Sequence, residues 1–463
     1  MTYTLGWDDG VVVAIDQRVL PHELRWLRLA TVEEVIEAIT TLAVRGAPAI
    51  GLAGAFGVAL SAHLHADPAV VRADAERLAK ARPTAVNLAW GVRRALGRLD
   101  QGAPAVLAEA SMMLAEDEAT NRTAARLAAG LVLSLTPDRP LRVLTHCNTG
   151  RLATAAWGTA LGTISDLAGR GLIEEVLVDE TRPLLQGARL TAWELAEQGI
   201  PHRLLVDSAA AAAMSLGQVD VVLVGADRIT ARGDVANKIG TYGLAVSAAR
   251  HRIPFIVVAP ESTVDNTLAH GSEIVVEERA AAEVTSFGGT PVAPAGVAVF
   301  NPAFDVTPAE LVSAVVTERR VWRPNHGAEL ARRITEALGE GLDLSGVYTD
   351  PALFGATAGA LAEEFRGSFD AVLGLASGGL LLGAALARHA EVPLVLPGNP
   401  VAPGTRVLVV DEVLGDRLGD AAELVWGSGG TVAGFGVLLV ESGSGDAEKL
   451  APHKVVALAE VSG

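Results

Sequence analysis

The sequence predicts an α/β protein whose main sheet is mostly parallel. Between residues 141 and 258, short and uniformly apolar runs alternate with helix-like segments. Such runs are typical of parallel strands that helices cover on both faces. The pattern before residue 135 is instead mainly helical, and the alternation of strands and helices resumes after residue 348. A chain of 463 residues, half of them hydrophobic, is long enough for two or three domains with large cores.

Residues 1–135 are expected to form a mainly helical N-terminal domain after a short β-prone start. Apolar residues recur at helical spacing over 32–44, with Thr31 as a plausible N-cap and two glutamates in the first turn. The segment 45–51, Arg-Gly-Ala-Pro-Ala-Ile-Gly, is too rich in glycine and proline to continue this helix. A second helix is expected from there to about Leu64.

Residues 136–320 are expected to form a Rossmann-like domain with a mostly parallel sheet. The expected strands lie at 143–144, 176–178, 204–206, 221–224 and 255–258. Several of these runs end in a polar or glycine-containing turn. Because ligands bind beyond the carboxyl ends of the strands in open α/β sheets, Cys147, Arg182 and Asp227 should gather at one edge of this sheet.

The only cysteine of the chain, Cys147, stands in the polar turn Thr-His-Cys-Asn-Thr-Gly of residues 145–150, and a helix-like stretch follows at 152–157. A free cysteine is most often a small buried hydrophobe. Polar neighbours, however, tune the pKa and accessibility of a thiol, so a proton carrier or nucleophile is an equally good interpretation. One cysteine also excludes an internal disulfide and suits a reducing cytoplasm.

The formal net charge of −17 argues against non-specific binding of nucleic acid. It does not oppose a small anionic substrate, because local arginines, lysines and backbone amides can bind a phosphate. Apolar stretches are broken before the ~18 residues that a membrane span needs. The first ten residues do not resemble a signal peptide, so a cytoplasmic protein without a membrane partner is expected.

Several polar segments invite a functional interpretation. Arg45, Gly46 and Ala47 offer a cation and backbone amides ahead of a helix, which is a natural phosphate cradle. Arg82 is a second cation beside a proline turn. Each of these segments taken alone is better explained as an ordinary turn with a solvated arginine.

Asp227 follows four apolar residues and a Gly-Ala pair, so it should sit at a buried strand end. Burial raises the pKa of a carboxyl group, which suits it to act as an acid. The alternative is an ion pair with Arg228. Gln186 can hydrogen-bond a sugar hydroxyl, and Asn237 and Lys238 add an amide and a cation nearby.

Taken together, these motifs resemble the methylthioribose-1-phosphate isomerase family, in order along residues 1 to about 320. The motifs that carry the resemblance lie at 45–51, 82–88, 145–150, 179–195, 225–229, 236–242 and 301–308. The wider family also contains ribose-1,5-bisphosphate isomerases and regulatory subunits of translation initiation factor 2B. The regulatory subunits typically lack the cysteine and aspartate pair, so the presence of Cys147 and Asp227 favours an enzyme.

The resemblance implies a homodimeric aldose-to-ketose isomerase of methionine salvage that acts on 5-methylthioribose 1-phosphate without a cofactor or metal. Asp227 would protonate the ring oxygen, and Cys147 would carry hydrogen from C2 to C1. A direct hydride shift, with Cys147 only shaping the site, is the rival route. The residues implied to bind the substrate are Arg45, Gly46, Ala47, Arg82, Gln186, Asn237 and Lys238. A ribose-1,5-bisphosphate isomerase and a non-catalytic sensor of sugar phosphates or nucleotides remain the alternatives.

The α/β rhythm lapses over residues 321–347, which include Gly339 and Gly341, so a linker and bridging helix are expected there. Residues 348–463 are expected to form a second, smaller α/β domain. Its expected elements are strands at 371–374, 393–396, 406–410 and 432–440, with a helix that follows the turn 376–379 and runs to Ala390.

The segment 407–416 resembles the diphosphoribose-binding motif of type I phosphoribosyltransferases, in which a strand ends in two acidic residues. The resemblance implies a phosphoribose site made of Ser377, Gly378, Gly379, Asp411 and Glu412. An ordinary pair of α/β turns is the alternative. Asp416 stands in the loop that should hold a phosphate, and little chain separates Gly379 from Asp411. We therefore expect a phosphoribosyltransferase-like domain that is degenerate.

Overall fold

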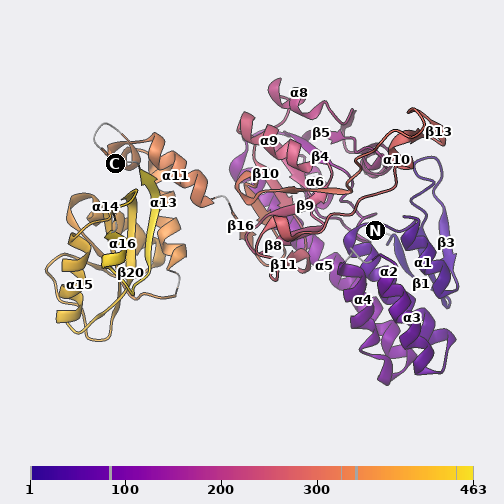
Figure 1. Ribbon diagram of the computed structural model, residues 1–463, viewed down its shortest axis with the longest axis horizontal. Coiled ribbons are helices and arrows are strands. Elements are labelled where there is room, and N and C mark those ends of the chain that lie inside the picture. Colours follow the sequence, from indigo (N-terminus) through magenta and orange to yellow (C-terminus); the bar gives the residue numbers. More distant parts are fainter. Residues whose placement is uncertain are drawn as a thin grey trace. The chain divides into compact units, whose positions relative to one another are not determined.

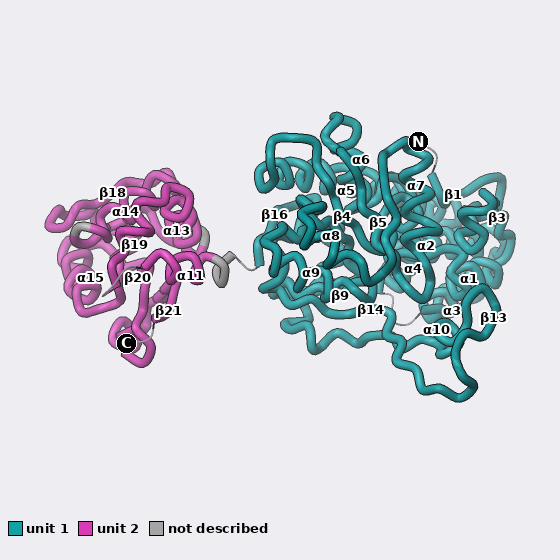
Figure 2. Tube along the Cα trace, turned by 90° about the horizontal axis from the view of Figure 1, so that it is seen from above, with its two compact units in different colours: residues 1–324 teal, residues 325–463 magenta. Residues whose placement is uncertain are grey.

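The computed structural model describes residues 3–82, 86–324, 326–338, 342–365, 367–444 and 446–461. The chain divides into two compact units, residues 1–324 and 325–463 (Figure 2). Each unit has its own sheet and its own hydrophobic core. Three residues of the motif 82–88, and Gly339 and Gly341 of the expected linker, lie outside the described residues.

Unit 1 begins with a three-stranded antiparallel sheet and continues with a run of helices (Figure 1). The strands are β1 (Leu5–Asp8), β2 (Val11–Ile15) and β3 (Trp26–Leu29), and the helices are α1 (Val32–Thr40), α2 (Ala47–Leu64), α3 (Pro68–Lys80), α4 (Val86–Leu96) and α5 (Ala103–Leu135). The predicted cap is present, since the Thr31 hydroxyl accepts the Glu34 amide at 3.2 Å and the Glu34 carboxylate accepts the Thr31 amide at 3.0 Å.

Helix α2 runs through the core of this helical region. It is long and apolar enough to cross a membrane by length and composition, but 78% of it is buried inside the structure. Glycines let α4 approach closely, because a Cβ added at Gly91 would overlap the backbone carbonyl of Gly51. The N-terminus of α2 is thereby fixed against the rest of unit 1.

The main sheet of unit 1 has seven strands in the order β16-β15-β10-β7-β4-β5-β6. The strands are β4 (Leu141–His146), β5 (Ile173–Asp179), β6 (His202–Leu205), β7 (Val221–Val224), β10 (Phe255–Val258), β15 (Ala314–Val316) and β16 (Val321–Trp322). All described pairings are parallel except that of the edge strand β16. From β4 the chain moves outward through β5 and β6, then returns to β7 on the other side, so the strand order reverses between β4 and β7.

Helices cover both faces of this sheet, as the uniformly apolar strands predicted. Val143 and Val176 pack with α5 and with α6 (Ala160–Gly169) on one face. Leu144 and Leu177 pack on the other face with α8 (Ala210–Ser215) and α9 (Thr241–His251). Other short elements of unit 1 include α7 (Ala192–Glu197), α10 (Ala282–Thr285), β12 (Ser286–Phe287) and β13 (Thr290–Pro291).

The stretch 152–157 is not helical, which corrects the sequence prediction; α6 begins only at Ala160. Its backbone carbonyls are used by distant partners instead. The Leu152 carbonyl accepts the Gln17 side-chain amide at 2.8 Å, and the Ala155 carbonyl accepts the Thr4 amide at 2.8 Å. These tertiary hydrogen bonds override the local helical tendency.

A second sheet of unit 1 follows the turn after β7. Its order is β11 (Val264–Asp265), β8 (Arg228–Thr230), β9 (Val235–Lys238) and β14 (Phe304–Thr307). The Asp227 amide donates to the Ala236 carbonyl at 2.9 Å. This pairing brings the end of β9, with Asn237 and Lys238, back toward the carboxyl edge of the main sheet.

Unit 2 has a five-stranded parallel sheet in the order β18-β17-β19-β20-β21. The strands are β17 (Ala371–Gly374), β18 (Leu394–Val395), β19 (Arg406–Val413), β20 (Thr431–Glu441) and β21 (Val455–Val461), and the helices are α11 (His326–Glu336), α12 (Ser345–Thr349), α13 (Pro351–Glu364), α14 (Ala376–Ala390), α15 (Arg417–Gly427) and α16 (Asp446–Lys449). Strand β21 was not anticipated. Helix α11, which falls in the expected bridging segment 321–347, packs on β21 and α13 within unit 2, whereas β16 belongs to the sheet of unit 1.

Candidate active site

The candidate site lies where the strand order of the main sheet reverses. Cys147 follows β4 and Asp227 follows β7, and these strands pair in parallel with Thr145 beside Leu223. Their turns pack tightly, because a Cβ added at Gly225 would lie 2.6 Å from Cγ2 of Thr149. The crevice outside such a reversal is the usual ligand site of open α/β sheets.

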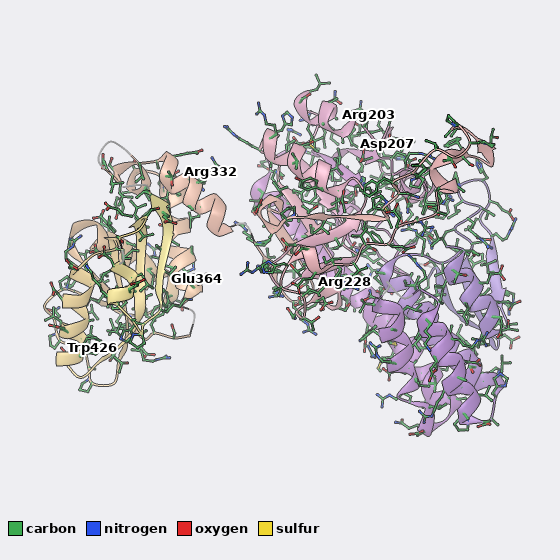
Figure 3. All side chains as sticks on the ribbon, in the orientation of Figure 1. Arg203, Asp207, Arg228, Arg332, Glu364 and Trp426 are labelled. Carbon is green, nitrogen blue, oxygen red and sulfur yellow. The ribbon has the colours of Figure 1, made fainter. Side chains whose placement is uncertain are left out.

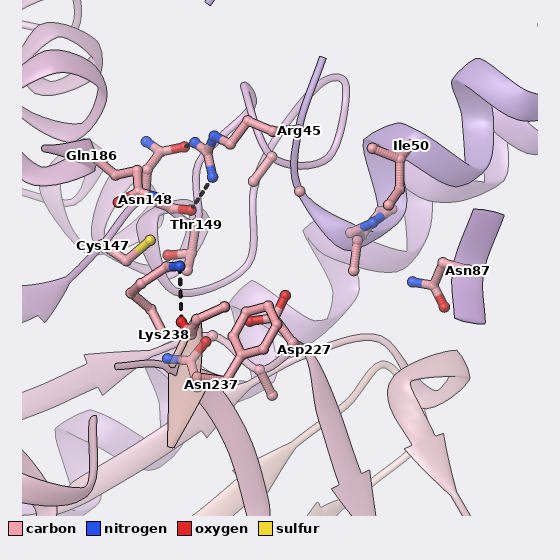
Figure 4. A pocket seen from close by; sticks show the side chains of 18 of the residues that line it. Arg45, Ile50, Asn87, Cys147, Asn148, Thr149, Gln186, Asp227, Asn237 and Lys238 are labelled. Carbon is pink, nitrogen blue, oxygen red and sulfur yellow. Dashed lines mark hydrogen bonds between the residues drawn. The ribbon is translucent and has the colours of Figure 1, made fainter. Parts of the chain in front are cut away.

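One cavity at this point is lined by all nine residues of unit 1 that the sequence analysis assigned to the site (Figure 4). They are Arg45, Gly46, Ala47, Arg82, Cys147, Gln186, Asp227, Asn237 and Lys238. Arg182 is not among the lining residues; its guanidinium donates to the Val284 carbonyl at 3.2 Å. The structure therefore brings together segments from both the helical region and the sheet.

Cys147 is 7% exposed and lines the cavity in a left-handed backbone conformation, with φ at 60°. Its carbonyl accepts the Thr191 hydroxyl at 2.5 Å, which fixes the turn. Burial raises the pKa of the thiol, while the nearby charges of Lys238 and Arg45 oppose that rise. The thiol therefore keeps its proton more firmly than a solvated cysteine does.

Asp227 ends the turn after β7, but its side chain keeps accessible surface inside the cavity rather than being sealed at a strand end. The crowded cavity raises the pKa of its carboxyl group, and Lys238, Arg82 and Arg45 partly offset that rise. It does not pair with Arg228, whose guanidinium instead lies 3.9 Å from the Asp265 carboxylate. A carboxyl group with a raised pKa and access to a ligand can donate a proton.

Arg45 is held in place by three groups of the protein itself. Its Nε donates to the Gln17 side chain at 3.0 Å, and its two terminal nitrogens donate to the carbonyl and side-chain oxygens of Asn148. The Asn148 side-chain amide in turn donates to the Glu194 carboxylate at 2.9 Å. The guanidinium is thus oriented from both the helical region and the Cys147 turn.

The N-terminus of α2 lies beside this guanidinium. Gly46 has φ at 97°, and a Cβ there would overlap the backbone of Ala153, so only glycine fits. Pro48 has no amide hydrogen, and the Ala49 amide donates to the Ala153 carbonyl at 3.2 Å. Gly46 and Ala47 are therefore the amides that this helix end can offer to an anion.

Lys238 and Asn237 come from the end of β9. The Lys238 ammonium donates to the Ala303 carbonyl at 3.0 Å and lies 5.0 Å from the centre of the Phe304 ring. The Asn237 amide donates to the Thr241 hydroxyl at 3.0 Å. Figure 4 shows Lys238 beside Cys147, with Ile50 and Asn87 on the opposite side of the cavity and Asp227 between.

Arg82 and Gln186 complete the predicted set. Arg82 lies 3.2 Å from the Glu277 carboxylate, which also pairs with Arg279 at 2.9 Å. The Gln186 side-chain oxygen accepts the Thr181 hydroxyl at 2.9 Å, so its amide nitrogen is the group that can reach a ligand. Glu277 offsets the positive charge on this side of the cavity.

The residues that hold the site together, chiefly Gln17, Asn148 and Glu194, were not predicted from the sequence. Glu194 is 1% exposed, and burial raises the pKa of its carboxyl group. A charged residue type within an otherwise apolar helical stretch, Trp193 to Leu195, was the available signal. Among the residues that the structure describes, no group of three His, Cys, Asp or Glu side chains is arranged to hold a metal ion.

Residues 43–324 match the family model described as the initiation factor 2 subunit family. A probable bifunctional methylthioribose-1-phosphate isomerase/methylthioribulose-1-phosphate dehydratase of Nocardia farcinica is 65% identical over 336 residues, which cover 72% of this chain and only 61% of that relative. A methylthioribose-1-phosphate isomerase of an Anaeromyxobacter strain is 55% identical, with 70% of this chain and 95% of the relative covered.

The solved structure of 5-methylthioribose 1-phosphate isomerase from Pyrococcus horikoshii is similar with a TM-score of 0.65 and 41% identity, covering 70% of this chain and 93% of that one. The family match ends at residue 324, where unit 1 ends. The second activity named for the Nocardia relative is a dehydratase, so that relative gives no support to a transferase-like unit 2.

Proposed function

The chain belongs to the initiation factor 2 subunit family, and on that premise we propose that unit 1 isomerises 5-methylthioribose 1-phosphate to 5-methylthioribulose 1-phosphate. One observation carries the proposal: Cys147 and Asp227 line a single cavity at the reversal of the strand order, together with Arg45 and Lys238. Relatives with this activity in their names cover the same part of the chain.

The phosphate on C1 prevents the sugar ring from opening as a free hemiacetal does, so an acid must assist. Asp227 donates its proton to the ring oxygen as the bond from C1 to that oxygen breaks. Hydrogen then moves from C2 to C1, and the 2-hydroxyl returns a proton to the Asp227 carboxylate as the C2 carbonyl forms. The raised pKa of the Asp227 carboxyl group supports this role, because the group holds its proton to higher pH than an ordinary carboxyl group does.

The raised pKa of the Cys147 thiol bears on how the hydrogen moves. A thiol that keeps its proton is a poor base, which favours a direct hydride shift with Cys147 enclosing the reacting carbons. A substrate deuterated at C2 tests this route in ordinary water. Full retention of deuterium at C1 is expected for the shift, whereas substantial washout indicates a proton carried by sulfur.

The substrate phosphate is proposed to bind Arg45 and the amides of Gly46 and Ala47, where a preset guanidinium meets a helix N-terminus. Gln186, Asn237 and Lys238 are proposed to bind the sugar hydroxyls and the phosphate, and Arg82 is proposed as a further cation. The apolar side chains of Leu42, Ile50 and Val86 line the same cavity. They suit a methylthio group better than a second phosphate.

The test compares three substrates on purified full-length protein: 5-methylthioribose 1-phosphate, 5-deoxyribose 1-phosphate and ribose 1,5-bisphosphate. We expect the first to be turned over well, the second to be turned over because its C5 end is also apolar, and the bisphosphate to be a poor substrate. A preference for ribose 1,5-bisphosphate would contradict the proposed substrate. Absence of turnover with all three would contradict an isomerase.

For unit 2 we propose a degenerate phosphoribosyltransferase-like domain with Ser377, Gly378, Gly379, Asp411 and Glu412 at its former phosphoribose site. Two features support it: the reversal of strand order between β17 and β19, and the meeting of the glycine turn with the acidic pair. A Cβ at Gly378 would overlap the Glu412 carboxyl group, which therefore occupies the space over the turn. Tyr348 holds that carboxylate with a hydrogen bond of 2.9 Å.

We also propose a cytoplasmic homodimer that needs no cofactor and binds a sugar phosphate rather than nucleic acid or a membrane. Its support is the acidic charge of −17, the single cysteine and the family resemblance. Sedimentation of the purified protein at micromolar concentration tests the dimer, and a single species of monomer mass would contradict it.

A further inference from the structure

We infer that His146 and Asp179 are a positioning pair that ties the Cys147 turn to the segment carrying Lys238. The inference rests on the proposed isomerase site and adds two residues to it. His146 is 2% exposed and is the last residue of β4, directly before Cys147. Its Nδ1 lies 2.7 Å from the Asp179 carboxylate, and its Nε2 lies 2.9 Å from the Ile239 carbonyl, directly after Lys238.

The two contacts fix how many hydrogens the pair holds. A backbone carbonyl can only accept, so Nε2 of His146 must carry a hydrogen. The contact with Asp179 needs a second hydrogen, on either Nδ1 or the carboxyl group. The pair is therefore neutral overall with both hydrogens in place, and the imidazole cannot turn without breaking a buried hydrogen bond.

The surroundings hold the ring in this position. Gly240 has φ at 107°, and a Cβ there would lie 2.8 Å from Cε1 of His146, so the start of α9 packs directly on the imidazole. The Asp305 carboxylate on β14 accepts the amides of Gly240 and Tyr242 at 2.7 and 3.1 Å. Asp179 and Asp305 are the titratable groups that face the ring, and Glu180 and Asp207 act on Asp179 from farther away.

The contact with Ile239 matters because of what Lys238 does. Lys238 is the charge that most opposes the rise in pKa of both the Cys147 thiol and the Asp227 carboxyl group. The residue after it, Ile239, is joined to the end of β4, directly before Cys147, through the imidazole of His146. If that link is lost, Lys238 can move away from both groups. The pKa values of the Cys147 thiol and of the Asp227 carboxyl group then rise together.

The test uses alkylation of Cys147, the only thiol of the chain, by iodoacetamide in the full-length protein. His146→Leu should slow alkylation at pH 8 by about tenfold and shift its midpoint upward by about one pH unit, because one pKa unit is a tenfold change in thiolate. His146→Gln keeps an amide donor near the position of Nε2, so it should restore most of the wild-type rate. Asp179→Asn should leave the midpoint nearly unchanged, because a neutral ring still donates to Ile239 while the new amide donates to Nδ1.

His202→Gln is the matched control, because His202 lies on the edge strand β6 and its Nδ1 contacts only the Ile200 carbonyl. In the isomerase assay, His146→Leu should lower kcat roughly 10- to 100-fold with KM changed far less, and the glutamine variant should recover.

If His146→Leu does not fold, unchanged thiol titration in Asp179→Leu would overturn the inference. An unchanged midpoint in folded His146→Leu would do the same. Since alkylation needs no substrate, a shifted midpoint in a protein without isomerase activity would reject the proposed function alone.

Discussion

The two units each place a glycine-containing turn and an acidic residue after neighbouring strands of a parallel sheet, at the point where the strand order reverses. In unit 1 these are the Cys147 turn after β4 and Asp227 after β7. In unit 2 they are Gly378 after β17 and the pair Asp411 and Glu412 at the end of β19. The same reversal of strand order, beyond which open α/β sheets usually bind ligands, thus occurs twice in one chain, and the region beyond it is here called the crevice of that unit.

The two crevices differ in what fills them. Asp227 faces an open cavity that also exposes Arg45, Arg82 and Lys238. In unit 2, Asp411 is fully buried with Arg417 at 3.2 Å, and the Glu412 carboxylate lies over the glycine turn under the Tyr348 hydroxyl. Topology therefore decides where a ligand can bind, while the charge and occupancy of the crevice decide whether an anionic ligand is accepted.

The largest effect in this comparison is expected from removal of the Asp227 carboxyl group in unit 1. Asp227→Asn should lower kcat by about 10²- to 10⁴-fold, the usual contribution of a positioned proton donor, while the fold stays intact. Turnover of 5-methylthioribose 1-phosphate and circular dichroism measure the two effects. Asp207→Asn is the control, because Asp207 is an exposed carboxylate after the edge strand β6 (Figure 3). Near wild-type turnover of Asp227→Asn would remove Asp227 from the mechanism.

A second prediction tests the cationic side of the unit 1 crevice. Arg45→Met should raise KM about 10- to 100-fold, because a charge-assisted hydrogen bond contributes about 1.5–3 kcal/mol. Steady-state kinetics measure it, and Arg18→Met is the control since Arg18 pairs with Asp16 outside the cavity. An unchanged KM would place the substrate phosphate elsewhere.

The strands and the positions of the candidate site residues could largely be predicted from the sequence. Buried strands are recognisable as uniform apolar runs, and the candidate site residues follow the ends of such runs. Nine of the residues that line the unit 1 cavity were predicted in this way and through family motifs, whereas others, such as Leu42 and Ile50, were not. The supports were not, since the Glu194–Asn148–Arg45 chain joins residues far apart in sequence that have no common pattern. The wrong helix at 152–157 has the same cause, because its carbonyls serve Gln17 and Thr4.

The third prediction asks whether the unit 2 crevice is closed by its own carboxylate. Wild-type protein should show no adenine-dependent turnover of phosphoribosyl pyrophosphate. Glu412→Ala removes the group over Gly378 and one negative charge, so it should bind phosphoribosyl pyrophosphate about fivefold more tightly, equivalent to about 1 kcal/mol. Isothermal titration calorimetry on the full chain measures this, with Glu423→Ala on α15 as the control. Turnover by the wild-type protein would show that the unit 2 crevice is also active. That result would contradict its closure by the Glu412 carboxylate.

The smallest effect concerns stability and tests whether the two units respond separately. Asp117 lies on α5 of unit 1, and one of its carboxyl oxygens is buried without a hydrogen-bond partner. Burial raises the pKa of this carboxyl group to about 7. A carboxyl group whose pKa is raised in the folded state stabilises the fold below its ordinary pKa, and this stabilisation is lost as pH rises toward 7. Asp117→Asn should therefore stabilise unit 1 by about 1–3 kcal/mol at pH 8, because asparagine avoids the cost of ionising a buried carboxyl group, and far less at pH 4, where that group keeps its proton in the folded protein. In differential scanning calorimetry the transition of unit 1 should shift while that of unit 2 stays in place, with the exposed Asp100→Asn as control. A common shift of all unfolding transitions would mean that the two units unfold as one, so that the state of one crevice could not be varied without the other.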